Sequence, residues 1–427
     1  MKRLLVMAYF YPPLAGGGVH RVLSFTQHLP AHGWDCTVVC AGEHDYWVRD
    51  LTLLERVPAD TEVLRVGGGS ALAGLLRVRG ASTAGRRSSG MFAGRRALSN
   101  WWLLPDSYVG WAARARNVAL ARIARGGIDA LLSSSPPDSV HLAGAKVAHA
   151  THLPWVADFR DPWMGLSFRR PPTLWHASRH RALEARVTGG ADLVLAASRT
   201  HLDQLAARAH ERPRQLLHLP NGFEPAPDRP VAPDPQHFRI AFTGTLSLME
   251  DAGTLLAAVR ELLAREPSAR AHLRIDLAGP YESEWPARAA ALGLTDVVRF
   301  PGPLAHADAR ALQRAADVLL LWKPREAGFA TMVPGKLYEY LDSGRPVVAL
   351  LPAGEEAALL VERAGGARLA PGDTAALASE LHVRYRRWLA GERAPDRRPD
   401  WLAAHTREHL AGELARALDG LGGGARA

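Results

Sequence analysis

The feature that most constrains the fold is an alternation of short apolar runs with segments of helical periodicity along almost the whole chain. A first series of runs reaches about residue 200 and comprises RLLVMAYFY, DCTVVCAG, TEVLRVGG, IDALLSSSP, LPWVADFRDPW and ADLVLAASRT. A second series comprises RIAFTGTL, RIDLAGP, VVRFPGP, ADVLLLW and RPVVALLP. Alternating strand and helix patterns are typical of parallel βαβ units. The sequence therefore predicts an α/β protein with two parallel sheets.

A proline-rich segment separates the two series. Residues 224–237 read EPAPDRPVAPDPQH, and prolines this dense support neither a helix nor a central strand. We expect an N-terminal domain at 1–223, a linker at 224–237 and a C-terminal domain at 238–396. The remaining residues, 397–427, contain an amphipathic helical pattern that could pack back on the N-terminal domain. With 427 residues, of which 47% are hydrophobic, the chain can form two complete cores.

The formal net charge of +9 at pH 7 indicates anionic partners. Phosphorylated substrates, nucleotides, acidic lipid surfaces and nucleic acids all fit this charge, and a general arginine bias explains it equally well. Residues 66–100 are rich in Gly, Ser and Arg and form either a surface loop or an element that meets an anionic acceptor or lipid. The arginines lack the interleaved aromatic residues of a base-stacking surface, so we expect no nucleic-acid partner.

The two cysteines and the opening of the chain bear on localisation. Cys36 and Cys40 lie in one strand pattern, roughly 13 Å apart on one face, which is too far for a disulfide. MKRLLVMAYFYPP lacks the small-residue cleavage site of a signal peptide, so a buried first strand is expected. No apolar run approaches the roughly 20 residues that span a bilayer. We expect a cytoplasmic protein, with peripheral contact to the inner face of the cell membrane as an extension of that expectation.

The stretch PGKLYEYLDSGRPVVAL predicts a short helix that leads into a strand. Leu337 and Leu341 are four residues apart and share the face that packs on a core, while Lys336 and Glu339 share a different face. Gly344 suits the left-handed residue that follows a helix. The helix would begin at the carboxyl edge of a sheet, where open α/β folds bind ligands. Lys336 would add positive charge where the helix dipole already favours phosphate.

A second candidate ligand site follows the first strand pattern, where AGGGVHR leads into a helix. Gly16, Gly17 and Gly18 have no side chains, so backbone amides can approach a ligand there. Arg21 replaces the third glycine of the dinucleotide fingerprint, which argues against a dinucleotide site. The loop is either a structural turn or a contact for phosphate or acceptor, with Arg21 as an additional anion contact.

The stretch DFRDPW places Asp158, Arg160 and Asp161 just after a buried strand pattern. Ionisable groups are costly at such a position unless they pair or act in chemistry. Two interpretations therefore stand: a salt bridge between Arg160 and a carboxylate, or a group of functional residues.

Eight stretches, in the same order along nearly the whole chain, give the sequence a family resemblance. The chain resembles the GT-B glycosyltransferases of the family 4 type, the glycosyl transferases group 1. The stretches are FYPPLAGGGVHRV, SSSPPDSVHLAG, LPWVADFRDPW, LPNGFE, FTGTL, IDLAGP, VRFPGPL and PGKLYEYLDSGRPVVAL.

The resemblance implies a fold and an activity. The fold would be two Rossmann-like domains that face a central cleft. The activity would be transfer of a sugar from a nucleotide-diphosphate-sugar donor to a hydroxyl acceptor, commonly with retention of configuration. The residues implied in donor binding are Gly244, Thr245, Lys336, Leu337 and Glu339. Near the acceptor, Asp158 would position it or accept its proton, with Arg160 and Asp161 beside it.

The chain also departs from the family pattern at donor-binding positions. Glu339 resembles the second glutamate of the E-x7-E motif, but Thr331 stands where the first is expected, unless Glu326 replaces it. Thr245 and Glu250 stand where the family often has two cations, a loss that Lys336, with Arg325 or Arg21, could offset. These departures leave open a non-catalytic nucleotide-sugar or glycan-binding protein, and the fold leaves open a nucleotide-sugar epimerase.

The sequence contains no D-x-D motif and no Cys/His cluster with zinc spacing. We therefore expect no metal and no resident cofactor, with the nucleotide-sugar acting as a co-substrate. Surface polysaccharide, glycolipid and other glycoconjugate pathways all remain open for the acceptor.

Overall fold

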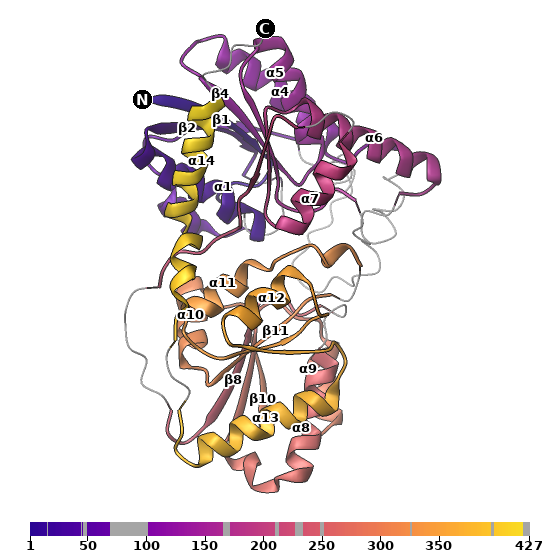
Figure 1. Ribbon diagram of the computed structural model, residues 1–427, viewed down its shortest axis with the longest axis vertical. Coiled ribbons are helices and arrows are strands. Elements are labelled where there is room, and N and C mark those ends of the chain that lie inside the picture. Colours follow the sequence, from indigo (N-terminus) through magenta and orange to yellow (C-terminus); the bar gives the residue numbers. More distant parts are fainter. Residues whose placement is uncertain are drawn as a thin grey trace, which may run out of the picture. The chain divides into compact units, whose positions relative to one another are not determined.

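The computed structural model describes residues 1–14, 16–43, 45, 49–68, 101–164, 171–209, 213–226, 234–247, 252–324, 327–393 and 397–421. The chain forms two compact units (Figure 1). The first comprises Met1–Asn221 and Arg407–Ala427, and the second comprises Gly222–Thr406. Most of the arginine-rich segment at 66–100, together with Glu250, Arg325 and Glu326, lies outside the described residues. The linker expected at 224–237 is only partly described and stays a prediction.

The first unit is built on a seven-stranded parallel sheet with the strand order β3-β2-β1-β4-β5-β6-β7. Its strands are β1 (Lys2–Ala8), β2 (Trp34–Ala41), β3 (Glu62–Val66), β4 (Ala130–Ser135), β5 (Trp155–Phe159), β6 (Leu193–Ala196) and β7 (Gln215–His218). The strand order reverses between β1 and β4. In open α/β sheets, ligands bind beyond the carboxyl ends of the strands at such a switch point.

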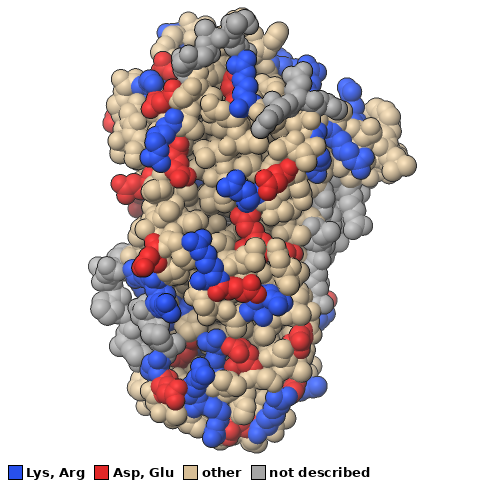
Figure 2. All heavy atoms as spheres, in the orientation of Figure 1, with Lys and Arg blue, Asp and Glu red and all other residues tan. Residues whose placement is uncertain are grey.

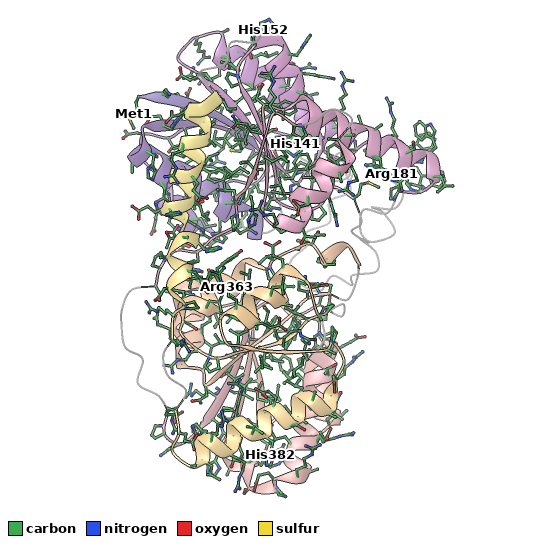
Figure 3. All side chains as sticks on the ribbon, in the orientation of Figure 1. Met1, His141, His152, Arg181, Arg363 and His382 are labelled. Carbon is green, nitrogen blue, oxygen red and sulfur yellow. The ribbon has the colours of Figure 1, made fainter. Side chains whose placement is uncertain are left out.

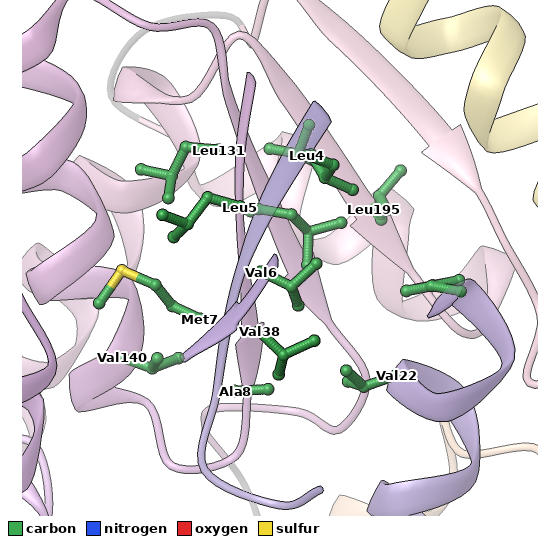
Figure 4. Close-up of a cluster of buried hydrophobic side chains, with 14 of the residues drawn as sticks. Leu4, Leu5, Val6, Met7, Ala8, Val22, Val38, Leu131, Val140 and Leu195 are labelled. Carbon is green, nitrogen blue, oxygen red and sulfur yellow. The ribbon is translucent and has the colours of Figure 1, made fainter. Parts of the chain in front are cut away.

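The core of the first unit surrounds its central strands. Figure 4 shows Leu4, Leu5, Val6 and Met7 of β1 packed among side chains of neighbouring elements. The described helices are α1 (Gly17–His28), α4 (Val109–Ile123), α5 (Ser139–Thr151), α6 (Leu174–Gly190), α7 (Arg199–Arg208) and α14 (Arg407–Leu421), with 3-10 turns η1 (Leu29–His32) and η2 (Leu51–Arg56). Parallel strands that are buried on both faces form nearly continuous apolar runs, which explains why the sequence predicted these strands.

The second unit is built on a six-stranded parallel sheet with the order β10-β9-β8-β11-β12-β13. Its strands are β8 (Phe238–Thr243), β9 (Leu273–Ala278), β10 (Val298–Gly302), β11 (Val318–Trp322), β12 (Val347–Leu350) and β13 (Ala367–Leu369). The described helices are α8 (Ala252–Arg265), α9 (Glu284–Ala291), α10 (His306–Ala315), α11 (Gly335–Asp342), α12 (Glu356–Arg363) and α13 (Thr374–Leu389), with η4 (Pro267–Ala271), η5 (Ala327–Phe329) and η6 (Asp400–His405). Here the order reverses between β8 and β11.

The expectation of an α/β protein with two parallel sheets is confirmed. The sequence pattern missed β7 and β13, which have only four and three residues. It also predicted one tail helix, whereas the structure has η6 and α14 separated by Thr406 in an extended conformation. In α14, Asp419 accepts hydrogen bonds from Lys2 and Trp34, so this helix belongs to the first unit.

Two further findings concern cysteines and membranes. Cys36 and Cys40 are buried free thiols, and burial raises the pKa of each to about 12. Among the described residues, no helix has both the length and the apolar character needed to cross a membrane. On the face shown in Figure 2, basic and acidic side chains are interspersed.

Candidate functional site

The carboxyl end of β8 passes directly into a glycine on which a lysine lies. Gly244 has φ +136°, and a Cβ atom added there would lie 2.8 Å from Nζ of Lys336. A second glycine, Gly279, follows the end of β9. A Cβ atom added there would lie 2.1 Å from the carbonyl oxygen of Gly244. A side chain at Gly279 would clash with backbone, whereas one at Gly244 would strain the backbone and displace the Lys336 ammonium group. This pair lets the ammonium group approach the backbone at the switch point of the second sheet.

Lys336 is the second residue of α11, which starts after Pro334. Its Nζ lies 3.8 Å from the centroid of the Phe242 ring, a cation–π contact, and Phe242 stacks on Trp322 at 4.3 Å. Leu337 is fully buried and anchors the helix to the core. The helix start and the ammonium group therefore combine two sources of positive potential.

Glu339 follows Lys336 by three residues on the same helix. Its Oε1 lies 3.0 Å from Nε2 of His306, and its Oε2 accepts a longer bond of 3.5 Å from Nε2 of Gln313. The Glu339 side chain is 19% exposed and that of His306 is 50% exposed. The carboxylate is thus oriented by α10 while solvent still reaches it.

Buried polar contacts fix α11 against α10 and the end of β8. Arg310 forms a buried ion pair with Asp342 and donates to the backbone carbonyl of Glu339 at 2.6 Å. The hydroxyl of Tyr340 accepts a hydrogen bond of 2.8 Å from the amide of Thr243, and burial raises the pKa of Tyr340 to about 12. These contacts hold the positions from which Lys336 and Glu339 project.

Lys323, directly after β11, organises the loop that leads to α11. Its Nζ is buried and donates to the carbonyl oxygens of Phe329 at 2.8 Å and Met332 at 3.0 Å. It also pairs with Glu355 at 2.6 Å. Burial lowers the pKa of Lys323, an effect that the pairing with Glu355 opposes. Lys323 therefore holds the loop that leads to α11, and its charge is buried and not exposed at the site.

At the first sheet, the glycine loop also carries a cation. Gly16 has φ +117° and precedes α1, which begins at Gly17. A Cβ on Gly18 would lie 1.7 Å from Nη1 of Arg160, so the guanidinium group packs on this glycine. Nη2 of Arg160 donates to Asp161 at 2.9 Å, and these two side chains are 12% and 21% exposed. The salt-bridge interpretation of DFRDPW thus describes Arg160 and Asp161.

Asp158 and Arg21 form a separate, buried pair. Nη2 of Arg21 lies 2.7 Å from Oδ1 of Asp158, and the side chains are 2% and 0% exposed. Ser134 donates to the other carboxylate oxygen at 2.7 Å, while Nη1 of Arg21 donates to the carbonyl oxygens of Leu219 and Pro220. These contacts hold both side chains within the fold. The roles expected for Asp158, as acceptor positioner or proton acceptor, and for Arg21, as an anion contact, stay predictions.

Two buried histidines lie close to the end of β5. The ring of His141, which is labelled in Figure 3, is 4.4 Å from that of Phe159, and its Nδ1 is 2.8 Å from the hydroxyl of Ser133. His201 meets the same Phe159 ring edge-on at 6.2 Å. Burial lowers the pKa of His141 to about 3 and that of His201 to about 4, so both are neutral near pH 7.

The comparisons with known proteins bear on both units. Residues 237–385 match the family model described as Glycosyl transferases group 1. The solved structure of Anabaena Alr3699/HepE in complex with UDP-glucose is similar over 99% of this chain and 98% of that one, with 15% identity and a TM-score of 0.57. The chain has the GT-B glycosyltransferase fold.

Other GT-B structures are similar over nearly their full length. WaaG, a glycosyltransferase involved in lipopolysaccharide biosynthesis, has 16% identity and a TM-score of 0.58, with 98% of this chain and 100% of that one covered. A putative UDP-N-acetylglucosamine 2-epimerase from Listeria monocytogenes has 13% identity and a TM-score of 0.57, with 98% and 96% covered. No curated protein matches the chain.

Within this GT-B chain, the structure brings Gly244, Lys336 and Glu339 together at one edge of the second sheet. Thr245 is exposed beside them, whereas Thr331, at the position of the missing glutamate, is buried. Within the described residues, no three His, Cys, Asp or Glu side chains are grouped to hold a metal ion. Sequence reasoning missed His306, Gln313 and Lys323. His306 and Gln313 lie 33 and 26 residues from Glu339 along the chain, so no local pattern joins them to it.

Proposed function

We propose that the protein is a glycosyltransferase that moves a sugar from a nucleotide-diphosphate-sugar to a hydroxyl acceptor. The observation that carries this proposal is the start of α11, where Lys336 lies over Gly244 and Glu339 follows on the same helix. The group 1 match and the UDP-glucose complex of the Anabaena protein support it.

The second unit would bind the donor. The diphosphate would contact Lys336 and the amides at the start of α11, while Gly244 and Thr245 would let the backbone approach it. Glu339, held by His306, would accept hydrogen bonds from the ribose hydroxyls. Leu337 would act through its anchoring of the helix.

The first unit would contribute the acceptor side. Arg160 and Asp161, together with the loop at Gly16, Gly17 and Gly18, carry its solvent-reachable polar groups at the sheet edge. We propose a retaining transfer without metal, in which the positive groups of α11 stabilise the leaving diphosphate. Fixed positive groups aimed at developing charge are often the largest contribution to catalysis. The nucleotide-sugar is a co-substrate, and no resident cofactor is part of the proposal.

A thermal-shift screen of nucleoside diphosphates and nucleotide-sugars tests donor binding. We expect one nucleotide class to raise the Tm of the parent protein and to have little effect on Glu339→Ala. Glu284→Ala, which changes an exposed glutamate at the start of α9, is the matched control and should respond like the parent. No response of the parent to any nucleotide would contradict the proposal.

A nucleotide-sugar epimerase is the second candidate, favoured by the similarity to the Listeria protein. The two functions differ in their products. A transferase converts the donor to nucleoside diphosphate and glycosylated acceptor, and it turns over slowly without acceptor. An epimerase releases an altered sugar with no acceptor present, which NMR of the donor sugar would detect. Binding of the donor without either product would favour a non-catalytic protein.

We also propose that the protein works at an acidic membrane surface in the cytoplasm, in glycolipid or surface-polysaccharide synthesis. Trp102, Leu174 and Trp175 are 86%, 87% and 63% exposed. The His176 ring lies between the rings of Trp101 and Trp175, at 5.7 Å and 4.9 Å, so the two segments are adjacent. Exposed tryptophans beside cationic groups are typical of membrane-interface sites.

The charge on α6 fits this proposal. Its exposed arginines are Arg179, Arg181 and Arg186, and its one carboxylate, Glu184, is buried. Arg181 is labelled on this helix in Figure 3. We expect flotation with phosphatidylglycerol vesicles but not with phosphatidylcholine vesicles. Trp102→Ser with Trp175→Ser should abolish flotation, whereas Leu359→Ser, an exposed apolar residue of the second unit, should not. Equal flotation of all three proteins would contradict the membrane proposal.

A further inference from the structure

A cavity of about 410 Å³ lies at the amino edge of the second sheet, at the opposite end of the strands from Gly244. It is lined by Phe238 at the start of β8, by Asp317 just before β11, by Val347 at the start of β12 and by the last turns of α13. Its volume falls in the range of small-molecule sites, which is about 300–1,000 Å³. This cavity is separate from the α11 site.

Guanidinium groups dominate the lining of this cavity. The arginines are Arg345, Arg384, Arg387, Arg393 and Arg397. Among the described residues, the side chains of Arg387 and Arg397 make no hydrogen bond or ion pair. Arg345 and Arg393 donate only to backbone carbonyls, at 2.8 Å and 2.9 Å, whereas Arg384 pairs with Glu380. In the part of the chain that the structure describes, four of the five arginines therefore form no salt bridge with a carboxylate, although Arg345 and Arg393 interact electrostatically with Asp317.

The acidic groups of the lining are Asp317 and Glu392. Asp317 accepts a hydrogen bond of 2.8 Å from the amide of Arg239, and burial raises its pKa. The carboxyl groups are fewer than the guanidinium groups, so the cavity has an excess of positive charge. Its apolar side comes from Phe238 and Trp388, which are 1% and 6% exposed.

We propose that this cavity binds a small molecule that carries a phosphate monoester. Guanidinium forks match phosphate oxygens in geometry and charge, and five arginines line this one cavity. The apolar wall would contact the organic part of the ligand. The phosphate could belong to a soluble metabolite or to a lipid headgroup, and the experiment distinguishes these sources. The site is independent of donor binding at α11.

Isothermal titration calorimetry with glucose 6-phosphate tests the soluble source. Flotation with phosphatidic acid vesicles tests the lipid source, in a protein that carries Trp102→Ser and Trp175→Ser so that the membrane contact proposed at α6 is removed. We expect saturable binding at one site per chain in one of the two assays. The double variant Arg387→Gln and Arg397→Gln should weaken it roughly tenfold or more, because charge-assisted hydrogen bonds to phosphate are lost. Binding should also weaken as salt is raised.

Two variants separate this site from other cationic surfaces. Arg386→Gln changes an exposed arginine beside Arg387 that pairs with Glu266, outside the cavity lining, and should bind normally. Lys336→Gln should also bind normally, because the phosphate does not use the α11 site. No saturable binding in either assay, or binding that the double variant retains in full, would overturn the proposal.

Discussion

At the carboxyl edge of each parallel sheet a cationic side chain packs on a glycine, but the surroundings of the two cations differ. At the first sheet the Arg160 guanidinium packs on Gly18, and at the second the Lys336 ammonium packs on Gly244. Arg160 is paired with the neighbouring Asp161, whereas Lys336 faces the Phe242 ring and its helix companion Glu339 is turned to His306. Arg160 thus lies beside a carboxylate at the first edge, whereas Lys336 lies at the start of a helix, where the helix dipole adds positive potential. The proposed diphosphate site in the second unit depends on this helix start.

A second arginine of the first unit, Arg21, forms a buried ion pair with Asp158. Its replacement should cause the largest loss of stability. Arg21→Met would leave the Asp158 carboxylate buried without its partner, which costs about 3–5 kcal/mol. Arg160→Met removes a partly exposed ion pair, for which we expect about 1 kcal/mol or less. Urea unfolding followed by circular dichroism measures both. Equal losses would show that the two arginines are not structurally distinct.

Lys336→Met and Arg160→Met together test which of the two sheet edges binds the diphosphate. In Lys336→Met we expect the Kd of the nucleoside diphosphate to rise roughly 100-fold, because a charge-assisted contact to phosphate contributes about 1.5–3 kcal/mol. Arg160→Met should leave that Kd unchanged. Isothermal titration calorimetry at one salt concentration measures both. A larger loss in Arg160→Met would assign the diphosphate to the first unit instead.

These pairings show what the sequence could and could not reveal. The runs of β1 and β8, the glycines and the α11 helix are local patterns, and each was predictable. The pair of Arg21 and Asp158 joins residues 137 positions apart, so no local pattern marks it. Likewise, His306 reaches Glu339 only because α10 and α11 pack together. Charge partners depend on tertiary packing, and packing is what the sequence alone did not show.

Acid should destabilise the first unit through its buried histidines. The pKa of His201 is about 4 in the folded state and about 6.5 in the unfolded state, so the unfolded chain binds more protons between these values. Stability is therefore lost as the pH falls below about 6.5, by about 1.4 kcal/mol per pH unit for this residue. His201→Leu removes that loss and should gain about 2 kcal/mol relative to the parent between pH 7 and pH 5. Urea unfolding at the two pH values measures it, and a pH-independent difference would contradict the assignment.

Alanine substitutions at two glycines should have modest effects on stability. Gly16 and Gly244 both have φ values that strain other residues, which costs about 1–2 kcal/mol each. A Cβ on Gly16 meets nothing within 4 Å, whereas one on Gly244 meets Lys336. Both variants should lose similar stability, but only Gly244→Ala should weaken nucleotide binding. Thermal denaturation with and without nucleotide separates the effect on stability from the effect on binding. Weakened binding in Gly16→Ala alone would instead indicate that the nucleotide binds at the first sheet.

The central claim is that the start of α11 binds the donor diphosphate. Hydrogen exchange of the backbone amides, measured by mass spectrometry with and without the nucleoside diphosphate that raises the Tm, tests it most directly. We expect slower exchange in the peptide that covers Gly335–Glu339 and no change in the peptide that covers Gly16–Arg21. Slower exchange in the peptide that covers Gly16–Arg21, with no change in the peptide that covers Gly335–Glu339, would contradict the assignment of the diphosphate to α11.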